Sequence, residues 1–428
     1  MLNITRFCKF RCSSVLPQAR LVFSNSRKDL LLKNGQARRH ISQALRQHYS
    51  QDKTLFKQFL RGSGTVAVRL GSDAANKGQK AVGYWLLTCS GMVLGAVVLG
   101  GVTRLTESGL SMVNWRLLGE KMPRTQQEWE EEFQRYQQFP EFKIKNKEIT
   151  LEEFKFIWHM EYGHRMWGRC IGAMFLIPAT YFWVRGRLTP AMKKRVLVFG
   201  SLIGAQGLMG WYMVKSGLED RFHEPSDVPR VSQYRLASHL SLAFILHSLF
   251  LWSALDILAP AQTINISGNA LKAARKFRGM VHGAKALVFL TAFSGAFVAG
   301  LDAGLVYNSF PKMADRWIPT DLLAYTPKLS NFTENPTTVQ FDHRILGTTT
   351  LAYLTAIYFI SRKRQLPPRA YTAAAVLAAL GYLQVSIGIA TLINYVPTDL
   401  AATHQSCSLA VLSAAIWLSH ELKKLPKV

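Results

Sequence analysis

The ten residues Met160–Arg169, MEYGHRMWGR, have a counterpart later in the chain, VQFDHRILGT at Val339–Thr348. Both stretches contain the pattern His-Arg-x-x-Gly, and both stand at the start of a long apolar segment. Ionisable side chains are costly at the edge of a bilayer, and where they occur they mark functional sites. The two stretches therefore indicate an internal repeat in which each copy carries its own polar site.

The repeat continues beyond these stretches with a Gln-x-x-x-Gly motif and then a second histidine near the start of the next apolar segment. These residues are Gln206, Gly210 and His239 in the first copy, and Gln384, Gly388 and His404 in the second. The spacing from the first histidine to the glutamine is nearly equal in the two copies. We therefore expect two related halves, each with one histidine on its second apolar segment and one on its fourth.

Of the 428 residues, 49% are hydrophobic, and they cluster in blocks of about 20 residues, enough helix to cross a bilayer. The eight predicted spans are 82–103, 164–184, 193–214, 237–258, 281–301, 343–361, 370–393 and 401–420. The sequence thus predicts an all-α polytopic membrane protein, whose eight transmembrane helices form two pseudo-symmetric four-helix bundles. The predicted divisions are a basic N-terminal segment at 1–80, the first bundle at 81–260 and the second at 261–428.

The N-terminal 80 residues are rich in Lys and Arg but contain only Asp29, Asp52 and Asp73 as acids. This composition, with frequent Ser and no Glu, is typical of a mitochondrial transit peptide. The alternative is a basic arm that binds nucleic acid. Because a membrane domain follows, we favour targeting and expect no nucleic-acid partner.

Alternate connections between the predicted spans are strongly basic. They contain Arg185, Arg187, Lys193, Lys194 and Arg195; Lys272, Arg275, Lys276 and Arg278; Arg362, Lys363, Arg364 and Arg369; and, in the tail, Lys423, Lys424 and Lys427. By the positive-inside rule, these connections and both termini face the matrix if the protein lies in the mitochondrial inner membrane. All four repeated histidines then lie near the outer face.

Two facing imidazoles in a four-helix bundle are suitable axial ligands for haem iron. We therefore predict that His164 and His239 form one pair of ligands and that His343 and His404 form the other. The motif glycines Gly168, Gly210, Gly347 and Gly388 would let a flat macrocycle approach the backbone. Arg165 and Arg344 are candidates for contacts with haem propionates. The alternative is that these arginines anchor helix ends among lipid headgroups.

The two copies differ three residues before the first histidine, where Glu161 stands in the first copy and Gln340 in the second. Positions i and i+3 lie on one face of a helix, so Glu161 is expected near whatever His164 binds. A carboxylate at only one of two otherwise similar sites suggests that chemistry takes place there. The simpler alternative is that Glu161 pairs with a nearby arginine.

Several motifs together resemble the haem A synthase family of the mitochondrial inner membrane, in its eukaryotic branch. Besides the two stretches above, they are GGVTRLTESGLSMVNW at 100–115, GAQGLMGWYMVKSGL at 204–218, RLASHLSLAF at 235–244 and ATHQSCSLAVL at 402–412. The resemblance covers about residues 80 to 420. Bacterial members carry a cysteine pair between spans five and six, whereas this chain has no cysteine from 302 to 342.

The resemblance implies an oxidoreductase that converts the C8 methyl group of haem O to a formyl group by successive hydroxylations, giving haem A for cytochrome c oxidase. It implies that His164 and His239 face the substrate haem, that His343 and His404 hold a haem b cofactor, and that Glu161 is the required glutamate. It further suggests a ferredoxin with its reductase as electron donor. Haem O synthase, membrane lipid and a second copy of the chain are the other partners considered.

Two other functions fit the same residues. A dihaem cytochrome that only transfers electrons would have two equivalent bis-histidine sites and would not need Glu161. An assembly factor or transporter would use the helices as a scaffold and the histidines for haem handling, packing or proton relay.

Overall fold

Helices are the only regular secondary structure in the part of the chain that the computed structural model describes, residues 78–219 and 230–426. Within these residues the extended backbone is limited to one isolated bridge between Met313 and Arg316. The all-helical class predicted from the sequence is confirmed. The predicted transit peptide falls almost entirely outside the described residues.

The helix bounds are Gly78–Leu105 for the first described helix, then α4 Gln126–Gln137, α5 Pro140–Ile144, α6 Leu151–Val184, α7 Pro190–Gly217, α8 Gln233–Leu258, α9 Gly268–Gly300, α10 Asn331–Glu334, α11 Pro336–Arg362, α12 Pro368–Ile393 and α13 Thr398–Glu421. Short 3₁₀ helices lie at η1 Ala303–Leu305, η2 Lys328–Ser330 and η3 Leu422–Lys424. Each predicted span falls within one of the long helices to within one residue.

Local sequence signals explain where the helices begin and end. Thr150 caps α6 in a capping box with Glu153, and Asn335 caps α11 by accepting hydrogen bonds from the next two free backbone N–H groups. Prolines occupy the first turn of α7, α11 and α12, where a missing N–H costs nothing. Gly186, at φ +62°, ends α6 in the left-handed conformation that favours glycine.

Five of the long helices in the described residues are long and apolar enough to cross a membrane: Gly78–Leu105, α7, α8, α9 and α12. The other long helices, α6, α11 and α13, do not meet that criterion. Each of these three carries a repeated histidine, and their polar side chains lower the mean hydropathy. Length and composition thus support membrane crossing for five helices, and the eight-span arrangement predicted from the sequence stays a prediction.

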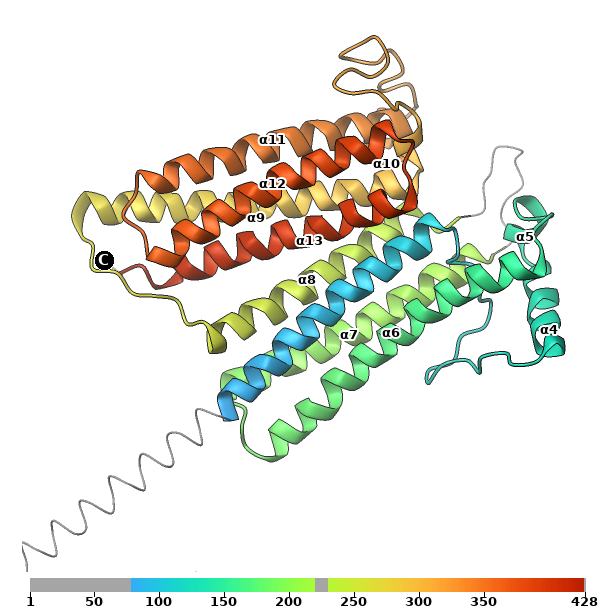
Figure 1. The fold of residues 1–428 in the computed structure, drawn as a ribbon, viewed down its shortest axis with the longest axis horizontal. Helices are drawn as coiled ribbons and strands as arrows, with labels where there is room; N and C mark the ends of the chain where they lie inside the picture. Colours follow the sequence, from blue (N-terminus) through green and yellow to red (C-terminus); the bar gives the residue numbers. More distant parts are fainter. Residues whose placement is uncertain (1–77, 220–229, 427–428) are drawn as a thin grey trace, which may run out of the picture. The chain divides into compact units, whose positions relative to one another are not determined.

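The long helices pack side by side in Figure 1. In one set of helices, α9 contacts α11 and α13, and α12 also contacts α11 and α13. In the other set, α7 contacts both α6 and α8. α8 also packs against α9 and α13, which joins the two sets. Alanines at these contacts, among them Ala284, Ala374 and Ala415, are fully buried and let the helix backbones approach closely.

α6 begins at Leu151, well before the predicted span at 164, so its first turns extend beyond the apolar segment. α4 packs against this extension. The aromatic residues of α4 at three- and four-residue spacing join Phe154 and Trp158 of α6 in a separate hydrophobic cluster. Trp129 and Tyr136 are buried there, so the amphipathic face of α4 is covered by protein.

Candidate functional site

Each repeated histidine rests against a glycine of a neighbouring helix. A Cβ added to Gly100 would lie 2.9 Å from Cε1 of His164, and one added to Gly210 would lie 3.2 Å from Cε1 of His239. The second half has the same arrangement: the distances are 3.0 Å from Gly295 to His343 and 2.6 Å from Gly388 to His404. A side chain at Gly100 or Gly388 would displace the imidazole, and one at Gly210 or Gly295 would require the ring to shift by a few tenths of an ångström. The glycines therefore help to fix how deeply each ring sits between its helices.

The repeated glutamines hold the fourth helix of each half in the same way. The Gln206 amide donates a hydrogen bond of 3.0 Å to the backbone carbonyl of His239, and the Gln384 amide donates one of 3.0 Å to that of His404. The Gln-x-x-x-Gly motif thus has two roles: the glutamine binds the backbone of the histidine, and the glycine one turn later accommodates the ring.

His343 and His404 face each other with ring centres 6.3 Å apart and ring planes nearly perpendicular, at 88°. Two imidazoles that share one metal, each with a metal–nitrogen distance of about 2 Å, have ring centres roughly 6 Å apart. The separation therefore fits a bis-histidine metal site. For His164 and His239 no ring contact is found among the described residues, so their pairing stays a prediction.

The two pairs differ in what holds the imidazoles. The Ser294 hydroxyl lies 2.8 Å from Nδ1 of His343, and the backbone carbonyl oxygen of Gln384 lies 3.1 Å from Nδ1 of His404. In the first half, Nδ1 of His164 and Nδ1 of His239 are buried and have no hydrogen-bond partner among the described residues. Such outer contacts normally orient a ligating histidine and fix its tautomer, so the second pair is held more firmly than the first.

Open space lies at the motif glycine one turn after the first histidine of each half. A Cβ on Gly168 or on Gly347 would meet nothing within 4 Å. Within the described residues, no group of three or more His, Cys, Asp or Glu side chains is arranged to hold a metal ion. Paired imidazoles, open space at a glycine and unpartnered buried ring nitrogens together fit a haem better than an ion bound by protein ligands alone.

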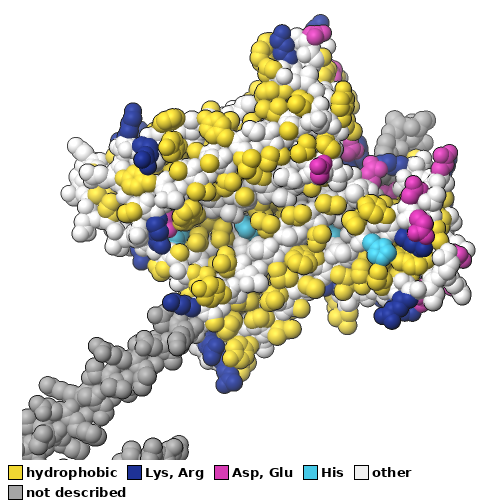
Figure 2. All heavy atoms as spheres, viewed as in Figure 1, with side chains coloured by type: hydrophobic (Ala, Val, Ile, Leu, Met, Phe, Trp, Pro, Cys, Tyr) yellow, Lys and Arg dark blue, Asp and Glu magenta, His cyan; other side chains and the backbone are white. Residues whose placement is uncertain are grey.

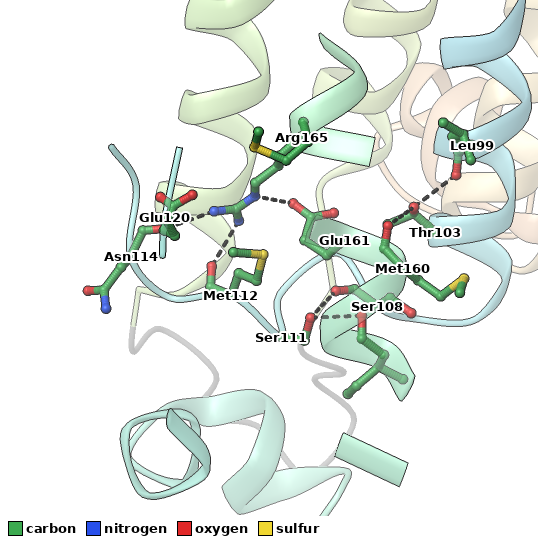
Figure 3. Close-up of polar contacts among 12 residues, drawn as sticks. Leu99, Thr103, Ser108, Ser111, Met112, Asn114, Glu120, Met160, Glu161 and Arg165 are labelled. Carbon is green, nitrogen blue, oxygen red and sulfur yellow. Dashed lines mark hydrogen bonds and ion pairs between the residues drawn. The ribbon is translucent and has the colours of Figure 1, made fainter. Parts of the chain in front are cut away.

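Glu161 lies on α6 one turn before His164, as the sequence predicts, and is buried, with 4% of its surface exposed. Arg165 Nε donates a 2.5 Å hydrogen bond to Glu161 Oε1 (Figure 3). The remaining guanidinium nitrogens donate to the carbonyls of Asn114, at 2.7 Å, and Met112, at 2.8 Å. Arg165 thus links Glu161 to the segment that follows the first helix.

In the second half Gln340 and Arg344 bind the corresponding connecting segment without a carboxylate. The Gln340 amide donates to the Ala303 carbonyl at 2.7 Å, and Arg344 donates to the carbonyls of Tyr307 and Ser309. Both motif arginines are therefore helix-to-loop clamps. The hydrogen bonds of Arg165 use all three guanidinium nitrogens, and contact of either arginine with a propionate stays a prediction.

His247, which lies two turns beyond His239 on α8, is part of a different contact. Its Nδ1 lies 3.0 Å from the Ser90 hydroxyl on the first helix, and its Nε2 lies 2.8 Å from the Ser413 hydroxyl on α13. Gln405 makes a second link between α13 and the first helix by donating to the Val97 carbonyl at 3.0 Å. His247 therefore joins helices of the two halves.

The comparisons with known proteins agree with the motifs. The family model described as "COX15-CtaA: Cytochrome oxidase assembly protein" matches residues 83–416. The chain is 58% identical over 366 residues to "Heme A synthase COX15" of Homo sapiens, which covers 85% of this chain and 87% of that protein. It is 42% identical over 371 residues to the protein of the same name in Saccharomyces cerevisiae, and the match covers 81% of this chain and 76% of that protein. It is 37% identical over 402 residues to the "Heme A synthase-mitochondrial ferredoxin fusion protein" of Schizosaccharomyces pombe, and the match covers 87% of this chain and 65% of that protein.

Proposed function

The chain belongs to the COX15-CtaA family and is a haem A synthase, an oxidoreductase that acts on haem O, and we propose that the oxidation takes place in the half that carries His164 and Glu161. In this proposal His164 and His239 bind the iron of the substrate haem O. We propose dioxygen as the oxidant: each of two hydroxylations places one oxygen atom on the C8 methyl group, while two electrons from the donor and two protons reduce the other oxygen atom to water. The resulting geminal diol loses water to leave the formyl group of haem A.

The difference between the two histidine pairs is the observation that supports placing the oxidation in the first half. Only the first half has a buried carboxylate one turn before its first histidine, and only its imidazoles lack a partner at Nδ1. A substrate must enter and leave, so loosely held ligands suit it, whereas a resident cofactor is better served by ligands with fixed tautomers. We propose that His343 and His404 hold a haem b, which supplies the capacity for one-electron transfer.

Glu161 is the group that we propose moves a proton in the first site. Its Oε1 is bound by Arg165, which fixes the orientation of the carboxylate, while Oε2 has no hydrogen bond among the described residues. A carboxylate oriented in this way can accept a proton from the geminal diol as the diol loses water. The Arg165 guanidinium keeps the negative charge balanced in a buried setting, where an unpaired carboxylate would be costly.

We further propose that the eight long helices cross the mitochondrial inner membrane as two four-helix bundles, 81–260 and 261–428, with both termini in the matrix. On the face shown in Figure 2, hydrophobic side chains cover the middle of the helices. Acidic side chains gather near the end that carries α4 and α5, while several Lys and Arg lie at the opposite end. Lys and Arg also lie among the acidic side chains at the α4 and α5 end, whereas acidic side chains are scarce at the opposite end. This bias supports the orientation expected from the positive-inside rule.

A ferredoxin is the electron donor that we propose. The relative in Schizosaccharomyces pombe is named as a fusion with a mitochondrial ferredoxin. The basic connection between α6 and α7 and the basic first turns of α9, which hold Lys272, Arg275, Lys276 and Arg278, would face the matrix and would attract an acidic carrier. Arg187 of the connection between α6 and α7 is stacked over Tyr181, at 5.4 Å from the ring centre, and Lys193 in the first turn of α7 is stacked over Trp183, at 5.1 Å.

The proposal is tested by haem extraction from cells that lack their own haem A synthase and express variants of this chain. We expect Glu161→Gln to lower haem A by about 100-fold or more and to let haem O accumulate, since general acid–base groups contribute on that scale. Asp342→Asn is the matched control, because it makes the same change one residue before His343 on α11, and we expect near-normal haem A. Wild-type levels of haem A from Glu161→Gln would contradict the role of Glu161.

A further inference from the structure

Arg235 stands in the first turn of α8, four residues and therefore about one helical turn before His239. Its guanidinium lies over the ring of Tyr212 on α7, with Cζ 4.6 Å from the ring centre, and Nη2 donates to the Tyr212 hydroxyl at 3.3 Å. The stacking fixes the orientation of the flat guanidinium against α7.

The guanidinium of Arg235 is incompletely satisfied. Nη1 is buried and has no hydrogen-bond partner, and no ion pair to Arg235 is found within residues 78–219 and 230–426. Two other arginines near this end of the helices, Arg104 and Arg230, both pair with Asp302, at 2.8 and 3.5 Å, although Nε of Arg104 is also buried without a partner among the described residues. A buried N–H group without an acceptor costs free energy, so Arg235 is poised to bind an acceptor that the described protein does not supply.

Arg235 also distinguishes the two halves. When His239 is aligned with His404, the residue four positions earlier is Arg235 in the first half and Leu400 in the second. The cation is thus present only in the half that carries Glu161. A general role at the outer end of the helix would be expected in both halves, whereas recognition of a substrate is needed in only one.

We infer that Arg235 binds a carboxylate of the substrate, one of the propionate groups of haem O, and so positions the macrocycle against His239. This inference rests on the proposed function, because it takes the first pair as the substrate site. A guanidinium matches a carboxylate with two parallel hydrogen bonds, a match that Lys cannot reproduce. Arg165, the arginine expected from the sequence, has all three nitrogens bound to protein oxygens.

The test is an absorbance titration of the purified full-length protein with haem O and with the dimethyl ester of haem O, in which both carboxylates are blocked. We expect wild-type protein to bind the acid about 10- to 100-fold more tightly than the ester, the range for a hydrogen bond to a charged group. Arg235→Leu should weaken binding of the acid by that factor and leave binding of the ester unchanged. Arg235→Lys should recover only part of the loss.

Lys215→Met is the matched control, since Lys215 is a cation stacked 5.0 Å from the ring centre of the neighbouring Trp211 on α7. We expect it to keep the preference for the acid. Equal affinity of wild-type protein for acid and ester would overturn the inference, and so would a preference that survives in Arg235→Leu. Failure of wild-type protein to bind haem O at all would instead contradict the proposed function. The comparison of the two ligands on wild-type protein needs no variant, so a variant that fails to fold does not prevent a decision.

Discussion

Gly388 on α12 and the imidazole of His404 on α13 are in such close contact that a Cβ on the glycine would lie 2.6 Å from Cε1 of the histidine. The same glycine–histidine contact occurs at all four repeated histidines, and that of Gly388 is the tightest of the four. Real Cβ atoms do not approach other atoms this closely, so the glycine sets the position of the ring.

Gly388→Ala is therefore expected to push His404 away from His343 and to weaken binding of the second haem. A change in the support of a metal ligand typically costs 10- to 100-fold in affinity, and we expect a loss of about that size. Haem content per purified protein, measured by the pyridine haemochrome spectrum, checks this. Gly204→Ala on α7 is the control, because its Cβ would meet nothing within 4 Å. A full haem complement in Gly388→Ala would show that the ring adapts.

Ser294 supports the other ligand of that pair, with its hydroxyl 2.8 Å from Nδ1 of His343. Ser294→Ala should leave the ligand in place but free its ring, so that haem affinity falls by about 10-fold and the reduction potential of the bound haem shifts. A redox titration of the purified protein measures both the amount of haem and its potential. Ser248→Ala removes a hydroxyl that bonds only to the Phe244 carbonyl and should change neither quantity. An unchanged potential in Ser294→Ala would rule out control of the ring by this hydroxyl.

The sequence predicts the helices and the histidine pairs because both depend on repeated local patterns. Apolar blocks of helical length locate the long helices, and the matched motifs identify His164, His239, His343 and His404. The glycines under two of these rings, Gly210 and Gly388, belong to a motif that the repeat makes visible. Their expected role was to admit a macrocycle, and the structure instead places them against the histidines.

The contacts of Gly100 and Gly295 with the histidines are not predicted from the sequence, because no polar motif is matched between the first helices of the two halves. A weaker signal was available: Ser108-Gly109-Leu110 corresponds to Ala303-Gly304-Leu305, and the same register pairs Gly100 with Gly295. It also pairs Glu107 with Asp302, and both adopt a left-handed backbone, with φ of 54° and 53°. The Ser294 contact could not be predicted, because it joins two helices in a way that no local pattern encodes.

Replacing Arg165 and replacing Glu161 should lower the stability of the fold by different amounts. Arg165→Gln removes the bonds to Met112 and Asn114 and leaves a buried carboxylate unpaired, which typically costs 3–5 kcal/mol. Glu161→Gln keeps the bonds of Arg165 to the connecting segment, so we expect a smaller loss. Thermal unfolding of the purified variants compares them, with Lys121→Gln, in an exposed pair with Glu128, expected to change little. Equal destabilisation by the two Glu161–Arg165 variants would show that the clamp to the segment contributes little.

The stability of the region around α4 and α5 is expected to depend on pH through Glu141. Burial raises the pKa of Glu141 to about 8, even though the Tyr136 hydroxyl donates to its carboxylate at 3.0 Å. Because this pKa is above that of a carboxyl in the unfolded chain, the protonated form favours folding. The stabilisation is fully present below the ordinary carboxyl range and is lost as the pH rises toward and through 8.

We therefore expect amide hydrogen exchange in α4, α5 and the first turns of α6 to become faster between pH 5 and pH 8, after correction for the intrinsic rate. Glu141→Gln cannot ionise, and its carbonyl can still accept from Tyr136, so it should remove this dependence and slow exchange at pH 8. Glu130→Gln, on the exposed face of α4, is the control and should behave as wild type. If the wild-type protein and Glu141→Gln show the same pH profile, then Glu141 does not titrate in this range.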